Sequence, residues 1–172
     1  SGHVYRYGDT NDPKFKKKVF TLQQEFAKKI GVKHCVAVSG GTAALMASMT
    51  ALGIGRGDEV LMPGYTFIAS MSATILVGAQ PVFTEMDESF TMDPKDLEHR
   101  ITSKTKAIMP VHTYGHPVDM DPMMELAERH GIVVLEDAAE AHGARYKGKR
   151  VGGLSDAAIF SFYGNKIITT GE

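Results

Sequence analysis

The chain has 172 residues, of which 43% are hydrophobic and 23% charged, so it has enough apolar mass to bury the core of one globular domain. Its 19 basic and 20 acidic residues give a formal net charge of -1, which offers no general electrostatic reason to expect nucleic acid or an anionic membrane as a partner. No apolar run approaches the roughly 20 residues that span a bilayer, and the opening residues lack a signal-peptide core, so we expect a cytoplasmic protein.

The first third of the chain predicts a helix, a strand and a second helix. Apolar residues recur at spacings of three and four over Pro13–Ile30, which predicts an amphipathic helix that Gly31 ends. The β-prone run Cys35–Val38 predicts a strand, and its single cysteine is expected to be a core thiol in a reducing compartment. The glycine turn Ser39–Thr42 then leads into a helix that ends at Leu52-Gly53.

The rest of the chain alternates short hydrophobic runs with helical patterns. Strands are expected at 59–62, 81–85, 106–111, 132–136 and 157–162, and helices at 66–77, after Asp93-Pro94, and at 119–130. This alternation predicts an α/β fold with a mainly parallel sheet and helices on both faces. Such sheets bind ligands at the carboxyl ends of their strands, so the residues just past each strand are the candidates for a site.

The glycine turn Ser39–Thr42 lies at the mouth of a predicted helix, where free backbone N–H groups and the positive dipole end favour a phosphate. Thr42 could instead be only an N-cap. The segment lacks the Gly-Lys-Ser/Thr ending of a Walker loop. It also lacks the G-x-G-x-x-G pattern of a dinucleotide site, which argues against a nicotinamide-dependent oxidoreductase.

A carboxylate and a lysine follow two of the predicted strands. Asp137 comes after Leu135-Glu136 at the end of a buried strand, where it either caps the next turn or faces a protonated heterocyclic nitrogen. Lys166 follows the run Phe160–Asn165 and precedes two isoleucines, so it is either an ordinary solvated lysine or a partly desolvated amine suited to Schiff-base chemistry.

Four ordered segments together resemble the signature segments of the DegT/DnrJ/EryC1/StrS aminotransferases. They are Ser39–Leu45, Pro63–Ala69, Glu136–Gly143 and Phe160–Lys166. The resemblance extends from about Tyr5 to Glu172. It implies the type I fold of pyridoxal-phosphate enzymes, with pyridoxal 5'-phosphate as the cofactor.

The resemblance also implies a role for each matching residue. Lys166 matches the catalytic Schiff-base lysine, and Asp137 matches the carboxylate that keeps the pyridine nitrogen protonated. The remaining cofactor contacts would be Gly41, Thr42 and Ser161 at the phosphate, Phe67 stacked on the ring unless it is a core phenylalanine, and Glu140, where the family usually has Gln, near the ring hydroxyl. Gly40 departs from the Ser or Asn that is commoner in the family.

The reaction that the resemblance implies is amino transfer from an amino acid, usually glutamate, to a keto-sugar that is typically nucleotide-linked. A dehydratase branch of the family has histidine where Lys166 stands, so the lysine favours transfer. The segment Phe160–Glu172 looks most like members that make perosamine, whereas Tyr5–Gly8 is similar to a branch acting on eight-carbon sugar acids. The family works as a homodimer.

Family members are about twice as long and continue into a C-terminal domain. We therefore expect residues 1–172 to be an incomplete cofactor-binding large domain without the small domain, with Ser1-Gly2-His3 as a tag remnant. The alternative is a truncated module that binds the cofactor or a partner without catalysis. No metal site is expected, because His112, His116 and His142 lack the spacing of metal ligands on a helix.

Overall fold

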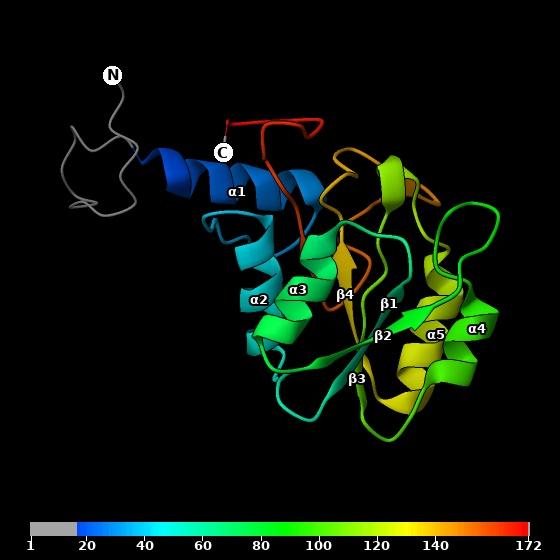
Figure 1. Cartoon of the computed structure of the whole chain (residues 1–172). Helices are drawn as coiled ribbons and strands as arrows, with labels where there is room; N and C mark the ends of the chain where they lie inside the picture. The colour runs from blue at the N-terminus through cyan, green and yellow to red at the C-terminus, as the bar shows by residue number, and fades with distance from the viewer. Residues whose placement is uncertain (1–16, 172) are drawn as a thin grey trace. The chain divides into compact units, whose positions relative to one another are not determined.

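The computed structural model describes residues 17–171, which are divided between two compact units with the boundary between Val38 and Ser39. The described part of the first unit contains one helix, α1 (Lys18–Ile30), drawn in blue in Figure 1. Gly31 ends it as predicted, in the left-handed conformation at φ 93°, and its N–H donates to the Ala27 carbonyl at 2.9 Å. The predicted beginning of the helix at Pro13 lies outside the described residues.

The strand predicted at Cys35–Val38 is wrong. These residues form neither helix nor strand, and the backbone N–H of Ala37 donates to Oε1 of Gln23 at 2.9 Å. Val36 is 65% exposed, and Cys35 is half-buried rather than a core thiol, although burial raises the pKa of its thiol. A β-prone sequence becomes a strand only where a neighbouring strand accepts its hydrogen bonds.

The second unit contains the predicted parallel sheet. All of its neighbouring strands are paired in parallel, in the order β2-β1-β3-β4-β7. The strands are β1 (Glu59–Pro63), β2 (Gln80–Thr84), β3 (Thr105–Ile108), β4 (Val133–Asp137) and β7 (Ala157–Ile159). β3 lies on the opposite side of β1 from β2, so the chain reverses direction across the sheet between β1 and β3, the place where such sheets bind ligands.

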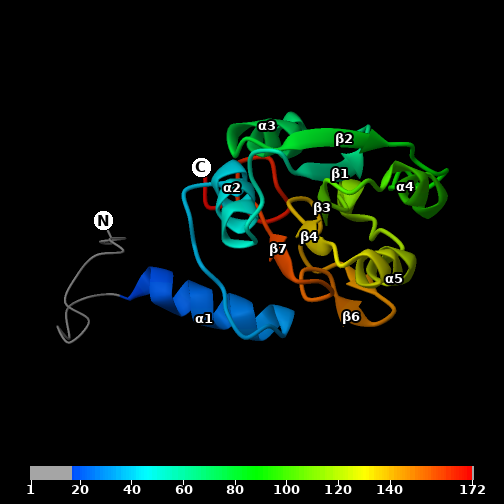
Figure 2. The ribbon, with the colours of Figure 1, turned by 90° about the horizontal axis from the view of Figure 1, so that it is seen from below.

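Helices cover both faces of the sheet, as predicted (Figures 1 and 2). α2 (Gly41–Ala51) and α3 (Ile68–Leu76) pack on one face through a core that includes Leu45 and Met49. α4 (Pro94–Arg100) and α5 (Met120–His130) pack on the other face through a core that includes Leu97 and Met123. Successive strand residues supply the two cores alternately, since side chains on a strand point to opposite faces.

The connection from β4 to β7 is not the helix that usually joins parallel strands. It holds a short antiparallel hairpin, β5 (Arg145–Tyr146) and β6 (Lys149–Arg150), which the sequence analysis missed. β7 also ends at Ile159, three residues earlier than predicted, so Ser161 lies in a loop beyond the sheet. Within residues 17–171, no helix has the length and apolar character needed to cross a membrane.

Candidate active site

Asp137 is the last residue of β4 and only 5% exposed. Its Oδ2 accepts a hydrogen bond from Ser70 Oγ on α3 at 2.8 Å, and its Oδ1 accepts one from the Ala139 N–H at 3.2 Å. Burial raises the pKa of this carboxyl above its ordinary value, against the opposing effect of the two hydrogen bonds and of Lys166 and His112. The carboxylate therefore caps the following turn. A cationic ligand bound nearby would favour its ionised form, which burial disfavours.

Glu136, the residue before it, points to the opposite face of the sheet and is completely buried. Its carboxylate accepts hydrogen bonds from the N–H groups of Gly152 and Leu154, from Ser155 Oγ and from His112 Nε2, at 2.7 to 3.2 Å. Burial alone would raise its pKa, but these donors outweigh burial and leave the pKa below its ordinary value. Glu136 thus holds the β4–β7 connection in place as a buried anion.

The neighbours of His112 fix its tautomer. The Val118 N–H donates to its Nδ1 at 3.1 Å, so Nδ1 carries no proton and the ring donates from Nε2 to Glu136. The sequence analysis considered His112 only as a metal ligand and missed its pairing with Glu136. The described residues contain no group of three His, Cys, Asp or Glu side chains that could hold a metal ion.

Lys166 lies in the loop after β7, and its side chain is 10% exposed. Its Nζ donates to Glu140 Oε1 at 3.1 Å and lies 5.5 Å from the centre of the Phe67 ring. The alternative of an ordinary solvated lysine is therefore wrong. So is the alternative of Phe67 as a core residue, because that side chain is largely exposed and faces Lys166. An ammonium beside a carboxylate and over an aromatic face is held in one place by both contacts.

The beginning of α2 lies against Ser161. A Cβ on Gly41 would come within 3.2 Å of the Ser161 Cβ, a tight contact, so this close approach favours glycine. The N-cap is Gly40, in an extended conformation, so the alternative role of Thr42 as N-cap is wrong. Among residues 17–171 no side chain caps this helix, and its first N–H groups lack intrahelical partners. The structure thus brings together predicted phosphate residues that lie near the two ends of the second unit's sequence.

Glu140 joins Lys166 to a turn that follows β3. Its second oxygen, Oε2, accepts the backbone N–H of Tyr114 at 3.1 Å. The Tyr114 hydroxyl contacts the hydroxyl of Tyr65, which follows β1, and this contact raises the pKa of Tyr114. The loops after β1, β3, β4 and β7 therefore all contribute to one site at the carboxyl ends of the strands. No role was predicted from the sequence for Tyr65.

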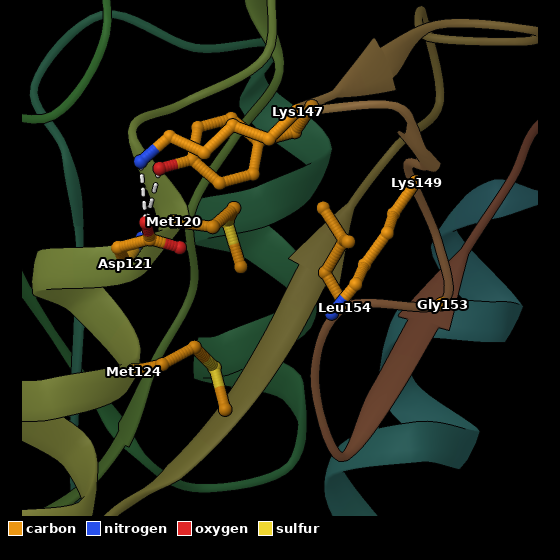
Figure 3. A pocket seen from close by; sticks show the side chains of 8 residues that line it. Met120, Asp121, Met124, Lys147, Lys149, Gly153 and Leu154 are labelled. Atoms are coloured by element: carbon orange, nitrogen blue, oxygen red, sulfur yellow. Dashed lines mark hydrogen bonds and ion pairs between the residues drawn. The ribbon is translucent and has the colours of Figure 1, made fainter.

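A separate hollow of about 400 Å³ lies between α5 and the β5–β6 hairpin (Figure 3). It contains none of the predicted site residues, and two of its polar side chains already have partners, Lys147 with Asp121 and the Tyr146 hydroxyl with Asp119. The residues that line it are Met120, Asp121, Met124, Tyr146, Lys147, Lys149, Gly153 and Leu154. The chemistry therefore belongs to the site around Lys166.

Comparison with known proteins agrees with this geometry. The profile of the DegT/DnrJ/EryC1/StrS aminotransferase family matches residues 12–172. The chain is 52% identical over 155 residues to a GDP-perosamine synthase of Caulobacter vibrioides. The aligned residues cover 90% of this chain and 42% of that protein.

Solved structures agree as well. DesV of S. venezuelae has a TM-score of 0.86 at 48% identity, covering 88% of this chain and 41% of DesV. A structure of ntda from Bacillus subtilis with bound cofactor pmp has a TM-score of 0.84 at 32% identity, covering 88% of this chain and 34% of that one. The predicted α/β type I fold is confirmed, and the chain spans less than half the length of these relatives.

Proposed function

Because the chain belongs to the DegT/DnrJ/EryC1/StrS aminotransferase family, we propose that it is the cofactor-binding large domain of a pyridoxal-phosphate-dependent sugar aminotransferase. The whole enzyme would transfer an amino group from an amino acid, glutamate in our proposal, to a nucleotide-linked keto-sugar. One observation carries the proposal. A sheltered lysine, a buried carboxylate and an uncapped helix N-terminus beside a serine meet at the carboxyl ends of the strands.

The residues present fit the cofactor. The close approach of Gly41 to Ser161 places this serine at the start of α2, whose first N–H groups, including that of Thr42, would hold a phosphate. Asp137, whose pKa burial raises, suits a protonated ring nitrogen. Phe67 offers its ring face, and Glu140 lies beside Lys166, where the ring hydroxyl and the reactive carbon of the cofactor would lie together.

When bound, pyridoxal phosphate supplies an electron sink for the bond broken at the donor's α-carbon. The chain's own residues would do the rest. Asp137 keeps the ring nitrogen protonated, and the N–H groups at the start of α2 fix the phosphate end. Lys166 would hold the cofactor through its Nζ. Once released by an amino donor, that Nζ would take the proton from the donor's α-carbon and deliver it to C4′ of the cofactor.

The proposed acceptor class comes from two sources. The relative from Caulobacter vibrioides is a GDP-perosamine synthase, and position 166 is lysine rather than the histidine of the dehydratase branch. We propose amino-sugar synthesis for polysaccharide as the setting. We also propose a cytoplasmic homodimer, since Phe67, Tyr114 and Ile167 leave large apolar side chains exposed around the site.

The test is to mix the chain with pyridoxal phosphate, reduce with borohydride and map the modified lysine by peptide mass spectrometry. We expect labelling at Lys166, loss of that label in Lys166→Ala, and no loss in the control Lys147→Ala, which removes an exposed lysine of the hairpin. Labelling spread evenly over the surface lysines would contradict the cofactor assignment. Specific labelling without amine product from glutamate and a keto-sugar would identify the chain as a non-catalytic cofactor-binding module.

A further inference from the structure

The turn after β3 holds a bulky residue in an unfavourable backbone conformation. Tyr114 has φ 53° and ψ 23°, in the left-handed region that tyrosine rarely adopts. Its side chain is 74% exposed, so burial of the ring does not account for this conformation. A conformation that is unfavourable and not compensated by packing of its own side chain indicates that the neighbouring contacts hold it.

Hydrogen bonds hold the turn at both of its ends. On one side, His112 is fully buried between Glu136 and the Val118 N–H, and its own N–H donates to the Asp137 carbonyl at 3.1 Å. On the other side, the Gly115 N–H donates to the His112 carbonyl at 3.1 Å. The buried pair of His112 and Glu136 therefore fixes the residue at which the turn begins.

The turn contacts Glu140 at two places. The Tyr114 N–H donates to Glu140 Oε2 at 3.1 Å, and a Cβ on Gly115 would come within 3.1 Å of the Glu140 carbonyl oxygen. Gly115 has φ 81°, a conformation that favours glycine, and the space for a side chain at this position is tight.

Glu140 passes this restraint on to Lys166, because its other oxygen, Oε1, accepts from Lys166 Nζ at 3.1 Å. With one oxygen on a backbone N–H and the other on the ammonium, the carboxylate has little rotational freedom left. A carboxylate suits this place because both neighbours are donors, whereas a side-chain amide offers one acceptor and one donor.

We propose that the Tyr114–Gly115 turn is a positioning element for Lys166, acting through Glu140. The inference rests on the proposed function only in the use made of Lys166. It concerns the backbone of Tyr114 rather than its ring, and it reaches Lys166 through Glu140. Removing the restraint should free the Lys166 side chain from its sheltered position without unfolding the sheet.

The test measures the reactivity of Lys166 in the cofactor-free chain, so its outcome is separate from that of the borohydride experiment. Competitive labelling with a trace of acetic anhydride gives the acetylation rate of Lys166 relative to the exposed lysines Lys95 and Lys104 in the same sample. We expect Gly115→Ala and Glu140→Ala each to raise the relative rate about tenfold, the factor that corresponds to loss of one charge-assisted hydrogen bond, because Lys166 Nζ is then freer to react. The double variant should show no further increase, since both changes break one restraint.

Gly148→Ala is the matched control. Gly148 has φ 83°, close to that of Gly115, but a Cβ there meets nothing within 4 Å. It carries the same backbone penalty in the β5–β6 hairpin and should leave the relative rate of Lys166 unchanged. An equal rate in Gly115→Ala and the wild type, or additive effects in the double variant, would overturn the proposal.

A second measurement covers the case in which Gly115→Ala does not fold. The amide proton of Tyr114 belongs to an exposed residue, so slow hydrogen exchange there reports the bond to Glu140. We expect its exchange to be at least about tenfold slower in the wild type than in Glu140→Ala. Equal exchange rates in the two proteins would show that the turn does not hold the carboxylate, and would refute the inference.

Discussion

Replacing Asp137 by asparagine should stabilise the cofactor-free chain while weakening its hold on the cofactor. The change keeps the shape of the side chain. The amide oxygen can accept the Ala139 N–H, and the amide nitrogen can donate to Ser70 Oγ, which then turns its own proton toward Thr66 Oγ1 at 3.0 Å. Asp137→Asn therefore removes a buried charge and leaves its two partners satisfied.

The size of the effect follows from these partners. Burial raises the pKa of Asp137, which means that its ionised form is disfavoured in the fold at neutral pH. Relief of that penalty, less one weakened charge-assisted hydrogen bond, should stabilise the chain by about 1 kcal/mol. For a chain of this length that corresponds to a rise in melting temperature of roughly 2–4 °C.

The pH dependence has a definite sign. As the pH rises above the ordinary value of 3.8, the unfolded chain releases the proton of Asp137 while the folded chain keeps it, so the wild type loses stability until the raised folded pKa is passed. Asp137→Asn has no such loss. Its advantage over the wild type should therefore be absent at low pH, grow as the pH rises through this interval, and stay constant above it.

The assay is thermal unfolding of both proteins across this pH range, with and without pyridoxal phosphate. The cofactor should raise the melting temperature of the wild type more than that of Asp137→Asn, because the variant lacks the carboxylate that would pair with the ring nitrogen. A variant that is less stable than the wild type at neutral pH would refute the reasoning, as would a stability difference between the two proteins that does not change with pH.

Three further changes test other parts of the structure. Glu136→Ala should destabilise the chain by about 3–5 kcal/mol in urea unfolding, because it leaves His112 and the N–H groups of the β4–β7 connection without their acceptor; a loss under about 1 kcal/mol would contradict this account. Gly41→Ala places a methyl group against Ser161 and should weaken pyridoxal phosphate binding about tenfold, as measured by spectroscopic titration. Unchanged binding would contradict a phosphate site at the start of α2. Asp93→Ala removes the cap that accepts the Lys95 N–H at 2.9 Å and should lower the free energy of unfolding by about 1 kcal/mol, without changing cofactor binding.

Much of the fold could be predicted from the sequence because it depends on local patterns. Apolar spacing of three and four specifies a helix such as α5 within one or two residues of its observed bounds, and an Asp-Pro pair specifies where α4 begins. Hydrophobic runs of four to six residues gave the places of all five strands of the parallel sheet. The ends of these strands then located Asp137 and the loop of Lys166, since ligand sites of parallel sheets lie there.

Long-range contacts decided the rest. Cys35–Val38 has a strand-like composition but forms no strand, since a strand exists only through hydrogen bonds to another one. The sequence does not show that the neighbouring acids Glu136 and Asp137 have pKa values shifted in opposite directions. The pleat sends one to His112 and the other to Ser70, and only those partners lower the pKa of the first while burial raises that of the second.

The sequence by itself determined which chemical groups the chain carries and the order in which they occur, including the motifs that identify its family. Only the tertiary structure decided which groups meet. Gly41 contacts Ser161, and Glu140 joins Lys166 to the left-handed turn at Tyr114, across separations in the chain that no local pattern spans. The physical reason is that such contacts form only once the sheet has aligned the strand ends, so their geometry is a property of the packed fold.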